Sequence, residues 1–108
     1  MERKYKIGGH VIYVDKWGIP RDSLITVWWC GDNEIASYVS ENGEPGCNLV
    51  FVSGDEKRKD SCGRQTEHST SVVHKTAQPA DGFYWCWEDE LDESQKARLN
   101  QDRAEVAA

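Results

Sequence analysis

The sequence has no apolar run long enough to cross a membrane or to form the core of a signal peptide. Four of its first six residues are charged, two glycines follow at positions 8 and 9, and the mean hydropathy of the chain is −0.74. A membrane span needs about 20 apolar residues, and the core of a signal peptide needs about 7 to 15. We therefore expect a protein that enters no membrane, is not secreted through a signal peptide and stays inside the cell that makes it.

An excess of positive charge is also missing. The chain has 13 lysine and arginine residues against 19 aspartate and glutamate residues, which gives a formal net charge of −6 and a pI near 5.0. Residues 88–108 carry −4 of this charge, so residues 1–87 are nearly neutral. The basic stretch 57–59 is flanked by Asp55, Glu56 and Asp60 and is expected to be a solvated loop. We therefore do not expect binding to the phosphates of nucleic acids.

Motifs of catalysis and of metal binding are absent as well. The sequence has no Gly-x-Ser-x-Gly, phosphate-binding loop or His-Glu-x-x-His motif. Its four cysteines are spaced 17, 15 and 24 residues apart and form no Cys-x-x-Cys pair: Cys30, Cys47, Cys62 and Cys86. The sequence offers one candidate pair of nucleophile and general base, Cys62 with His68 or His74. Their separation in the sequence does not define a catalytic site. We predict no enzyme, no catalytic residue, no metal site and no cofactor, with the cysteines reduced.

Short apolar runs separated by turn-forming residues are what the sequence does contain. β-branched and aromatic residues predict strands at residues 10–15, 24–29, 48–53, 70–74 and 83–87, with a weaker candidate at 34–39. Glycine, proline and polar residues predict loops at residues 16–22, 31–33, 40–46 and 54–66. Strands of this number and length predict a mainly β protein, a small SH3-like barrel of five to six short strands.

The character of the sequence changes after residue 87. Leu91, Leu99 and Val106 form a thin helical stripe in an otherwise charged segment. Such a helix is marginal alone, so we expect either a docked acidic helix or a mobile arm. We divide the chain into a β-barrel domain, residues 1–87, and a C-terminal tail, residues 88–108.

Five tryptophans are a large number for a chain of 108 residues. Neighbouring Trp28 and Trp29 point to opposite faces of a strand, and we place Trp29 and Trp85 in the core. Trp85 and Trp87 share a face of the last strand with Phe83. For Trp17 and Trp87, core or cap positions and interface positions remain equally open, because tryptophan and arginine are enriched at binding hot spots.

The chain resembles a family of small proteins encoded by tailed bacteriophages and common in viral metagenomes. The matching positions run through residues 9–85. The most specific stretch begins at Asp60 and continues over residues 63–85, which read GRQ-x-E-x-x-TSVVH-x-x-x-Q-x-A-x-G-x-YW. Residues 9–15, 24–26, Trp29, 48–53 and Asp55 carry the rest of the match. Cys62, His68 and Asp81 depart from the family pattern, which weakens a site built on Cys62 and His68. The resemblance implies a bacteriophage origin and brings no activity with it.

The polar positions of this stretch have two interpretations. In the first, an exposed recognition patch is formed by Arg64, Gln65 and His74. In the second, which we favour, the same side chains are internal hydrogen-bonding groups that pin the long loop to the barrel. The candidate binding surface comprises Trp17, Arg21, Arg64, Gln65, His74 and Trp87.

We expect the protein to act by binding another protein, a phage structural protein or a second copy of itself. The first hypothesis is a virion-associated module, such as a head decoration or cement protein or a head–tail accessory. The second is an inhibitor of a host defence or metabolic enzyme, located in the host cytoplasm, whose acidic tail mimics a nucleic acid or occupies a basic groove. The third is a small-ligand-binding protein or enzyme, which requires a pocket lined by His74, Arg64 and a tryptophan.

Overall fold

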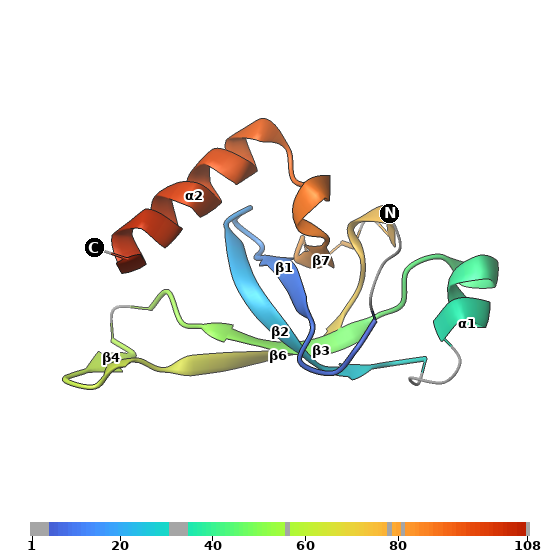
Figure 1. Cartoon of the computed structure of the whole chain (residues 1–108), viewed down its shortest axis with the longest axis horizontal. Helices are drawn as coiled ribbons and strands as arrows, with labels where there is room; N and C mark the ends of the chain where they lie inside the picture. The colour runs from blue at the N-terminus through green and yellow to red at the C-terminus, as the bar shows by residue number, and fades with distance from the viewer. Residues whose placement is uncertain (1–4, 31–34, 56, 78, 81, 108) are drawn as a thin grey trace.

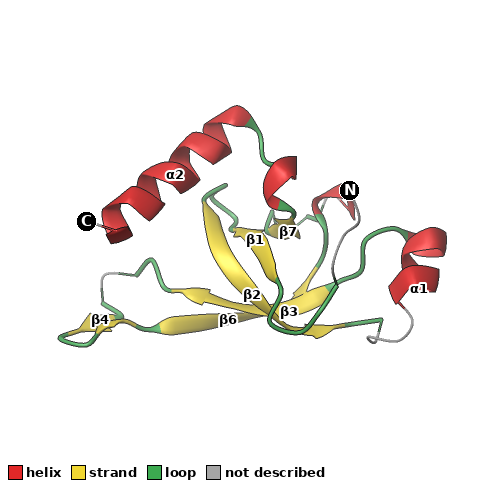
Figure 2. Cartoon of the chain, viewed as in Figure 1, coloured by secondary structure: helices red, strands yellow, loops and turns green. Residues whose placement is uncertain are grey.

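The computed structural model describes residues 5–30, 35–55, 57–77, 79–80 and 82–107. This part of the chain forms a curled five-stranded antiparallel sheet, a small two-stranded hairpin and a long C-terminal helix (Figures 1 and 2). The elements in chain order are β1 (His10–Val14), β2 (Pro20–Trp28), α1 (Ile35–Asn42), β3 (Cys47–Val52), β4 (Lys59–Asp60), β5 (Gly63–Arg64), β6 (Thr66–Val72), η2 (Lys75–Ala77), β7 (Tyr84–Cys86), η3 (Glu88–Glu90) and α2 (Glu93–Ala107). The predicted dominance of strands and the C-terminal helix are confirmed, and the sheet is a half-barrel.

The sheet curls so that its two edge strands approach each other at one end. The strand order is β6-β3-β2-β1-β7, with every neighbouring pair antiparallel. After β6 the chain crosses to β7, where the Trp85 N–H donates to the Val73 carbonyl at 2.9 Å and His74 forms a parallel bridge with Trp85. This bridge ties the two edges together beyond Val72, while the rest of β6 has β3 as its strand neighbour.

Side chains alternate along β1 between two hydrophobic clusters, one on each face of the sheet. Val11 and Tyr13 point into the first cluster, and Ile12 and Val14 point into the second. The first cluster fills the inside of the half-barrel with Ile25, Trp28, Ile35, Cys47, Leu49, Val72 and Trp85. The second cluster lies between the outer face of the sheet and the C-terminal segment, with Cys86, Leu91 and Leu99. β1 is thus buried on both faces.

The prediction that Trp29 lies in the core is wrong. Trp28 is 2% exposed and Trp29 is 58% exposed. The pairing with β3 shifts register between Ile25 and Val27, so β2 contains one extra residue at this point. One extra residue inverts which side chains face inward, and this turns Trp28 into the core. The core position of Trp85, which is fully buried, is confirmed.

Several element boundaries also differ from the prediction. The weak strand candidate at residues 34–39 is wrong, because Ile35 and Val39, four residues apart, both pack against the first cluster from α1. Residues 31–33, the predicted turn before it, lie outside the described residues. β2 begins inside the predicted loop 16–22, β6 begins four residues early, and the predicted loop 54–66 contains the β4–β5 hairpin.

The C-terminal helix is docked on the sheet. Its first turn is closed by a capping box, in which the Gln95 N–H donates to Asp92 Oδ1 at 2.8 Å and the Asp92 N–H donates to Gln95 Oε1 at 3.1 Å. Leu91 and Leu99 are buried against the outer face of β1, 5% and 3% exposed. Of the two alternatives left open by the sequence, a docked helix and a mobile arm, the structure has the docked helix.

Candidate functional site

The six residues of the predicted binding surface do not form one surface. Trp17 is 75% exposed in the turn between β1 and β2, whereas His74 is 2% exposed. Arg64 and Gln65 are exposed at the β4–β5 hairpin and the start of β6, and Trp87 is half-buried beside η3. Arg64 and Gln65 are neighbours in sequence, and His74 and Trp87 meet at Glu90 Oε1, so each group has to be interpreted separately.

The turn that carries Trp17 is organised by a buried carboxylate. Asp15 is 7% exposed, and its Oδ1 accepts the N–H groups of Trp17 and Ile19, each at 3.0 Å. Its Oδ2 faces the Arg21 guanidinium at 3.4 Å. The Trp17 ring is left in solvent with the Lys16 ammonium 4.6 Å from the ring centroid. The turn therefore presents Trp17 in a fixed position, and Trp17 remains a candidate contact residue.

Arg21 joins three parts of the half-barrel. Besides its ion pair with Asp15, its guanidinium lies 5.9 Å from the centre of the Phe51 ring. It also fills the space beside Gly54, where an added Cβ would lie 2.5 Å from both of its terminal nitrogens. Arg21 is thus engaged in holding the chain after β3, and we assign it a structural role.

His74 is an internal hydrogen-bonding residue. Its Nε2 lies 2.8 Å from Glu90 Oε1, and its Nδ1 lies 2.9 Å from the Thr76 hydroxyl. Its ring packs edge-on against Trp85 with centroids 4.7 Å apart. Glu90 Oε1 also accepts the Trp87 N–H at 2.8 Å. Both ring nitrogens are therefore satisfied inside the protein, and the preferred interpretation of His74 is confirmed.

Trp87 is likewise held from several sides. Its indole N–H donates to Glu44 Oε2 at 2.8 Å, and the Tyr5 hydroxyl donates to the other oxygen of the same carboxylate at 2.6 Å. The Trp87 ring packs edge-on against Tyr5 and Trp85. This network ties the N-terminal segment and the loop after α1 to the last strand, so the role of Trp87 is structural.

Arg64 and Gln65 lie on an exposed arm. The Gln65 N–H donates to the Arg58 carbonyl at 2.9 Å, and the Gln65 carbonyl accepts the Ser53 N–H at 2.8 Å. These backbone bonds prolong the β3–β6 hairpin into β4 and β5. The peptide groups pin this loop, while the side chains of Arg64 and Gln65 are exposed, and the role of these two side chains stays a prediction.

The outer face of β2, β3 and β6 is a surface that the sequence interpretation missed. Leu24 of β2 lies beside Val50 of β3, which lies beside His68 of β6. We define the outer face as these side chains with their neighbours on the same side: Leu24, Val50, Val52, Thr66, His68 and Thr70. None of the six is acidic, lysine or arginine, and Leu24 and Val52 are 49% and 55% exposed.

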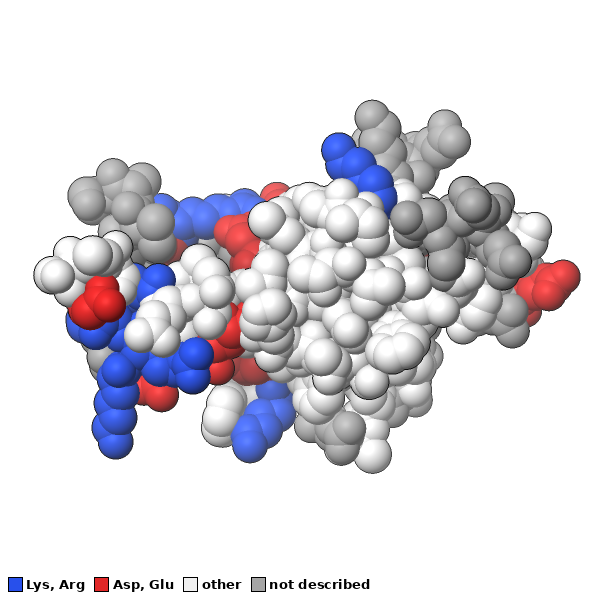
Figure 3. Space-filling view, turned by 90° about the horizontal axis from the view of Figure 1, so that it is seen from below, with Lys and Arg blue, Asp and Glu red and all other residues white. Residues whose placement is uncertain are grey.

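The charged residues of this side of the molecule gather at one end. Figure 3, which views the molecule from below, shows most of the lysine, arginine and acidic side chains near the end that carries the β4–β5 hairpin and an uncharged expanse over the middle, with a few charged side chains at the margins and at the other end. The α2 helix packs on the same side of the sheet as Leu24, over β1 and the start of β2, and leaves Leu24 and Val52 exposed beside it. Alternation of Leu24 with buried Ser23 and Ile25 was the signal in the sequence that could have found this face.

A compact ionic cluster fastens α2 beside this face. Arg103 Nη2 lies 2.6 Å from Asp22 Oδ1 and 2.8 Å from Glu88 Oε1, and His10 Nε2 lies 2.6 Å from Asp22 Oδ1. Hydrogen bonds from Arg103 hold the pKa values of Asp22 and Glu88 below their usual range, and these carboxylates raise the pKa of Arg103. His10, Asp22 and Glu88 are metal-ligand types close together, but the Arg103 guanidinium already binds both carboxylates, so we assign the cluster to helix anchoring.

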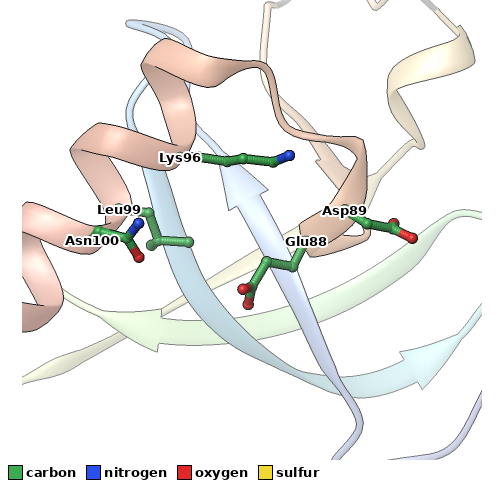
Figure 4. Close-up of a pocket in the computed structure, with 5 residues that line it drawn as sticks. All are labelled: Glu88, Asp89, Lys96, Leu99 and Asn100. Atoms are coloured by element: carbon green, nitrogen blue, oxygen red, sulfur yellow. The ribbon is translucent and has the colours of Figure 1, made fainter.

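A hollow of about 360 Å³ lies between η3 and α2 (Figure 4). It is lined by Glu88, Asp89, Lys96, Leu99 and Asn100. Glu88 is engaged by Arg103, and Leu99 belongs to the second hydrophobic cluster. The hollow contains neither His74, Arg64 nor a tryptophan, which were the residues expected around a ligand pocket.

Comparisons with models of protein families, with curated proteins and with solved structures found no match to this chain. None of the helices in the described residues has the length and apolar character needed to cross a bilayer.

Proposed function

We propose that this protein is a small non-enzymatic binding module of a bacteriophage, associated with the virion as a head decoration, cement or head–tail accessory protein. The observation that carries the proposal is the open, uncharged outer face, on which Leu24 and Val52 each expose about half of their surface. The resemblance of residues 9–85 to tailed-bacteriophage proteins supports the setting. The curled sheet with its hairpin connections supports placing the fold among the SH3-like barrels.

The chemistry of the outer face favours another protein as the partner. Burial of the exposed parts of Leu24 and Val52 contributes on the order of 1 kcal/mol for each side chain. The hydroxyl groups of Thr66 and Thr70 supply hydrogen bonds at the rim, which is the usual arrangement of a small interface. Such a contact is weak alone, but many copies bound to a repeating shell strengthen one another.

The docking of α2 supports this proposal over a host-enzyme inhibitor with a nucleic-acid-like tail. A mimic needs free acidic groups on an accessible segment. Glu88 is instead bound by Arg103, and Asp102 is bound by Arg98 four residues earlier at 3.3 Å. The charge of the tail is thus partly neutralised within the protein.

The test is incorporation into particles by variants of the outer face. Leu24→Glu and Val52→Glu place a charge on this face, and Gln101→Glu is the matched control because it adds the same charge on the exposed side of α2. Quantitative mass spectrometry of purified particles should show both face variants reduced to a small fraction of the wild-type copy number, with the control unchanged. Normal incorporation of Leu24→Glu and Val52→Glu would contradict the assignment of this face.

A further inference from the structure

The outward edge of β6 is an unpaired strand edge. β3 lies on one side of β6, and the sheet of the described residues ends at β6 (Figure 1). The Ser53 N–H donates to the Gln65 carbonyl, and every second residue of an antiparallel strand directs its peptide groups to the same neighbour. Glu67 and Ser69 therefore face β3. The residues that direct their N–H and C=O groups to the outward edge are Thr66, His68 and Thr70.

Beyond Thr66 this edge carries little of the usual protection against strand pairing. Natural edge strands carry lysine, proline or a covering element, and β6 has neither lysine nor proline. Its one charged side chain, Glu67, points to the other face of the sheet from Thr66 and His68. A distortion comes only at the end of the strand, where Ser71 has a φ of 56° and its N–H donates to the Asn48 side chain. At the start of β6 the Arg58 side chain donates to the outward Thr66 carbonyl at 3.5 Å, and the part of the edge at His68 and Thr70 is left open for pairing.

We propose that β6 pairs antiparallel with β6 of a second copy of this chain about a twofold axis at His68. This inference rests on the proposed function as a protein-binding module and names one of its partners. In this register Thr66 of one copy lies opposite Thr70 of the other, and Glu67 lies opposite Ser69. No like charges face each other, and threonine pairs are favourable across strands.

The pairing satisfies the outward backbone groups of both copies. The outward residues can exchange about six N–H···O bonds, since each directly opposed outward pair exchanges two; the two that use the Thr66 carbonyl replace its hydrogen bond from Arg58. It also joins the two uncharged outer faces into one, because Val50 and Leu24 continue the row that begins at His68. The dimer would therefore present a double-width outer face to the particle.

Proline at residue 70 tests the pairing. The Thr70 N–H points away from β3, so proline there removes a donor at the outward edge and none within the protein. Thr70→Val is the matched control, since it keeps the N–H and the branched shape. Analytical ultracentrifugation from micromolar to millimolar concentration should show dimers for the wild type and for Thr70→Val, and monomers for Thr70→Pro. A monomeric wild type, or a dimeric Thr70→Pro, overturns the proposal.

Amide hydrogen exchange gives a second readout that needs no variant. In the dimer the His68 and Thr70 amides are hydrogen-bonded, so their exchange slows as protein concentration rises. Fast exchange at every concentration overturns the pairing even if Thr70→Pro does not fold. Failure of the dimer leaves incorporation into particles to be judged separately through Leu24→Glu and Val52→Glu, so the two proposals fail independently.

Discussion

The guanidinium of Arg103 contacts Asp22 across 81 residues of sequence, with Nη2 2.6 Å and Nε 3.0 Å from the two carboxylate oxygens. The same guanidinium reaches Glu88 at 2.8 Å. One side chain near the end of α2 is thereby fixed to β2 and to η3 together. Together with the burial of Leu91 and Leu99 in the second cluster, this contact holds the C-terminal segment on the sheet.

Loss of this contact should loosen the end of α2 with a small effect on global stability. Arg103→Ala removes two partly exposed ion pairs, and exposed pairs contribute about 1 kcal/mol or less to the free energy of unfolding. Amide exchange of residues 99–104 should accelerate more than that of the sheet. Arg98→Ala, which breaks an exposed pair within the helix, is the control and should leave the exchange rates nearly unchanged; equal effects of the two substitutions would show that Arg103 is no anchor.

The same contact predicts a dependence of stability on pH. Arg103 lowers the pKa values of Asp22 and Glu88 in the folded protein. A carboxylate with a lowered folded pKa stabilises the fold above its unfolded pKa and loses this contribution as pH falls through the folded value. The stability difference between wild type and Arg103→Ala should be full at neutral pH and shrink below about pH 4. Urea unfolding at a series of pH values measures it, and a difference that grows in acid would refute the assignment.

The β2 bulge predicts opposite outcomes for the adjacent tryptophans. Trp28→Ala opens a cavity in the first cluster and should lower the free energy of unfolding by about 3 to 5 kcal/mol. Trp29→Ala removes a ring that is mostly in solvent and should cost about 1 kcal/mol or less. Chemical denaturation of the two variants decides the matter. If Trp29→Ala were the more damaging, the register of β2 against β3 would be wrong.

The hydrogen bond of His74 predicts a specific need at residue 90. Glu90→Ala leaves a buried ring nitrogen and the Trp87 N–H without an acceptor, which should cost about 1 to 3 kcal/mol of unfolding free energy. Glu90→Gln keeps an acceptor oxygen and should retain most of the stability. Glu93→Ala, at a residue whose side chain is 96% exposed, is the control and should be neutral. Equal loss in the alanine and glutamine variants would argue against the acceptor role.

The cysteines should differ sharply in reactivity. Burial raises the pKa of Cys47 and Cys86 to about 12, whereas Cys62 is exposed at the hairpin tip. Since the thiolate is the reactive form, iodoacetamide at mildly alkaline pH should modify Cys62 first and leave Cys47 and Cys86 intact until the protein unfolds. Peptide mapping by mass spectrometry measures the order, and early modification of Cys86 would show that the second cluster opens readily.

Much of the fold follows from local patterns in the sequence. Alternating and β-branched residues located β1, β3 and β7, and the face shared by Phe83, Trp85 and Trp87 holds because β7 is regular. The errors have long-range causes. The bulge at residues 25–27 is created by the pairing with β3, and α1 forms where Ile35 and Val39 can both reach a core that is built by distant strands.

The candidate site was less predictable for a related reason. His74 and Trp87 were chosen as polar or aromatic positions. Their hydrogen-bond acceptors, Glu90 and Glu44, lie 16 and 43 residues away in the sequence and bind these side chains inside the protein. The outer face was missed because Leu24 and Val52 look like core residues in a strand. The position of α2 on the sheet rests on the buried Leu91 and Leu99 and on the contact of Arg103 with Asp22, and spacing in the sequence does not reveal these partners.

The central claim is that this chain is a virion-associated binding module, and its location in an infected culture tests it most directly. Quantitative mass spectrometry compares the protein in particles purified from the encoding phage with the protein left in the cleared lysate. The account predicts enrichment in the particles, at a copy number that matches a repeating site on the shell or at the head–tail junction. Its complete absence from purified particles, with abundant free protein in the lysate, would contradict the account.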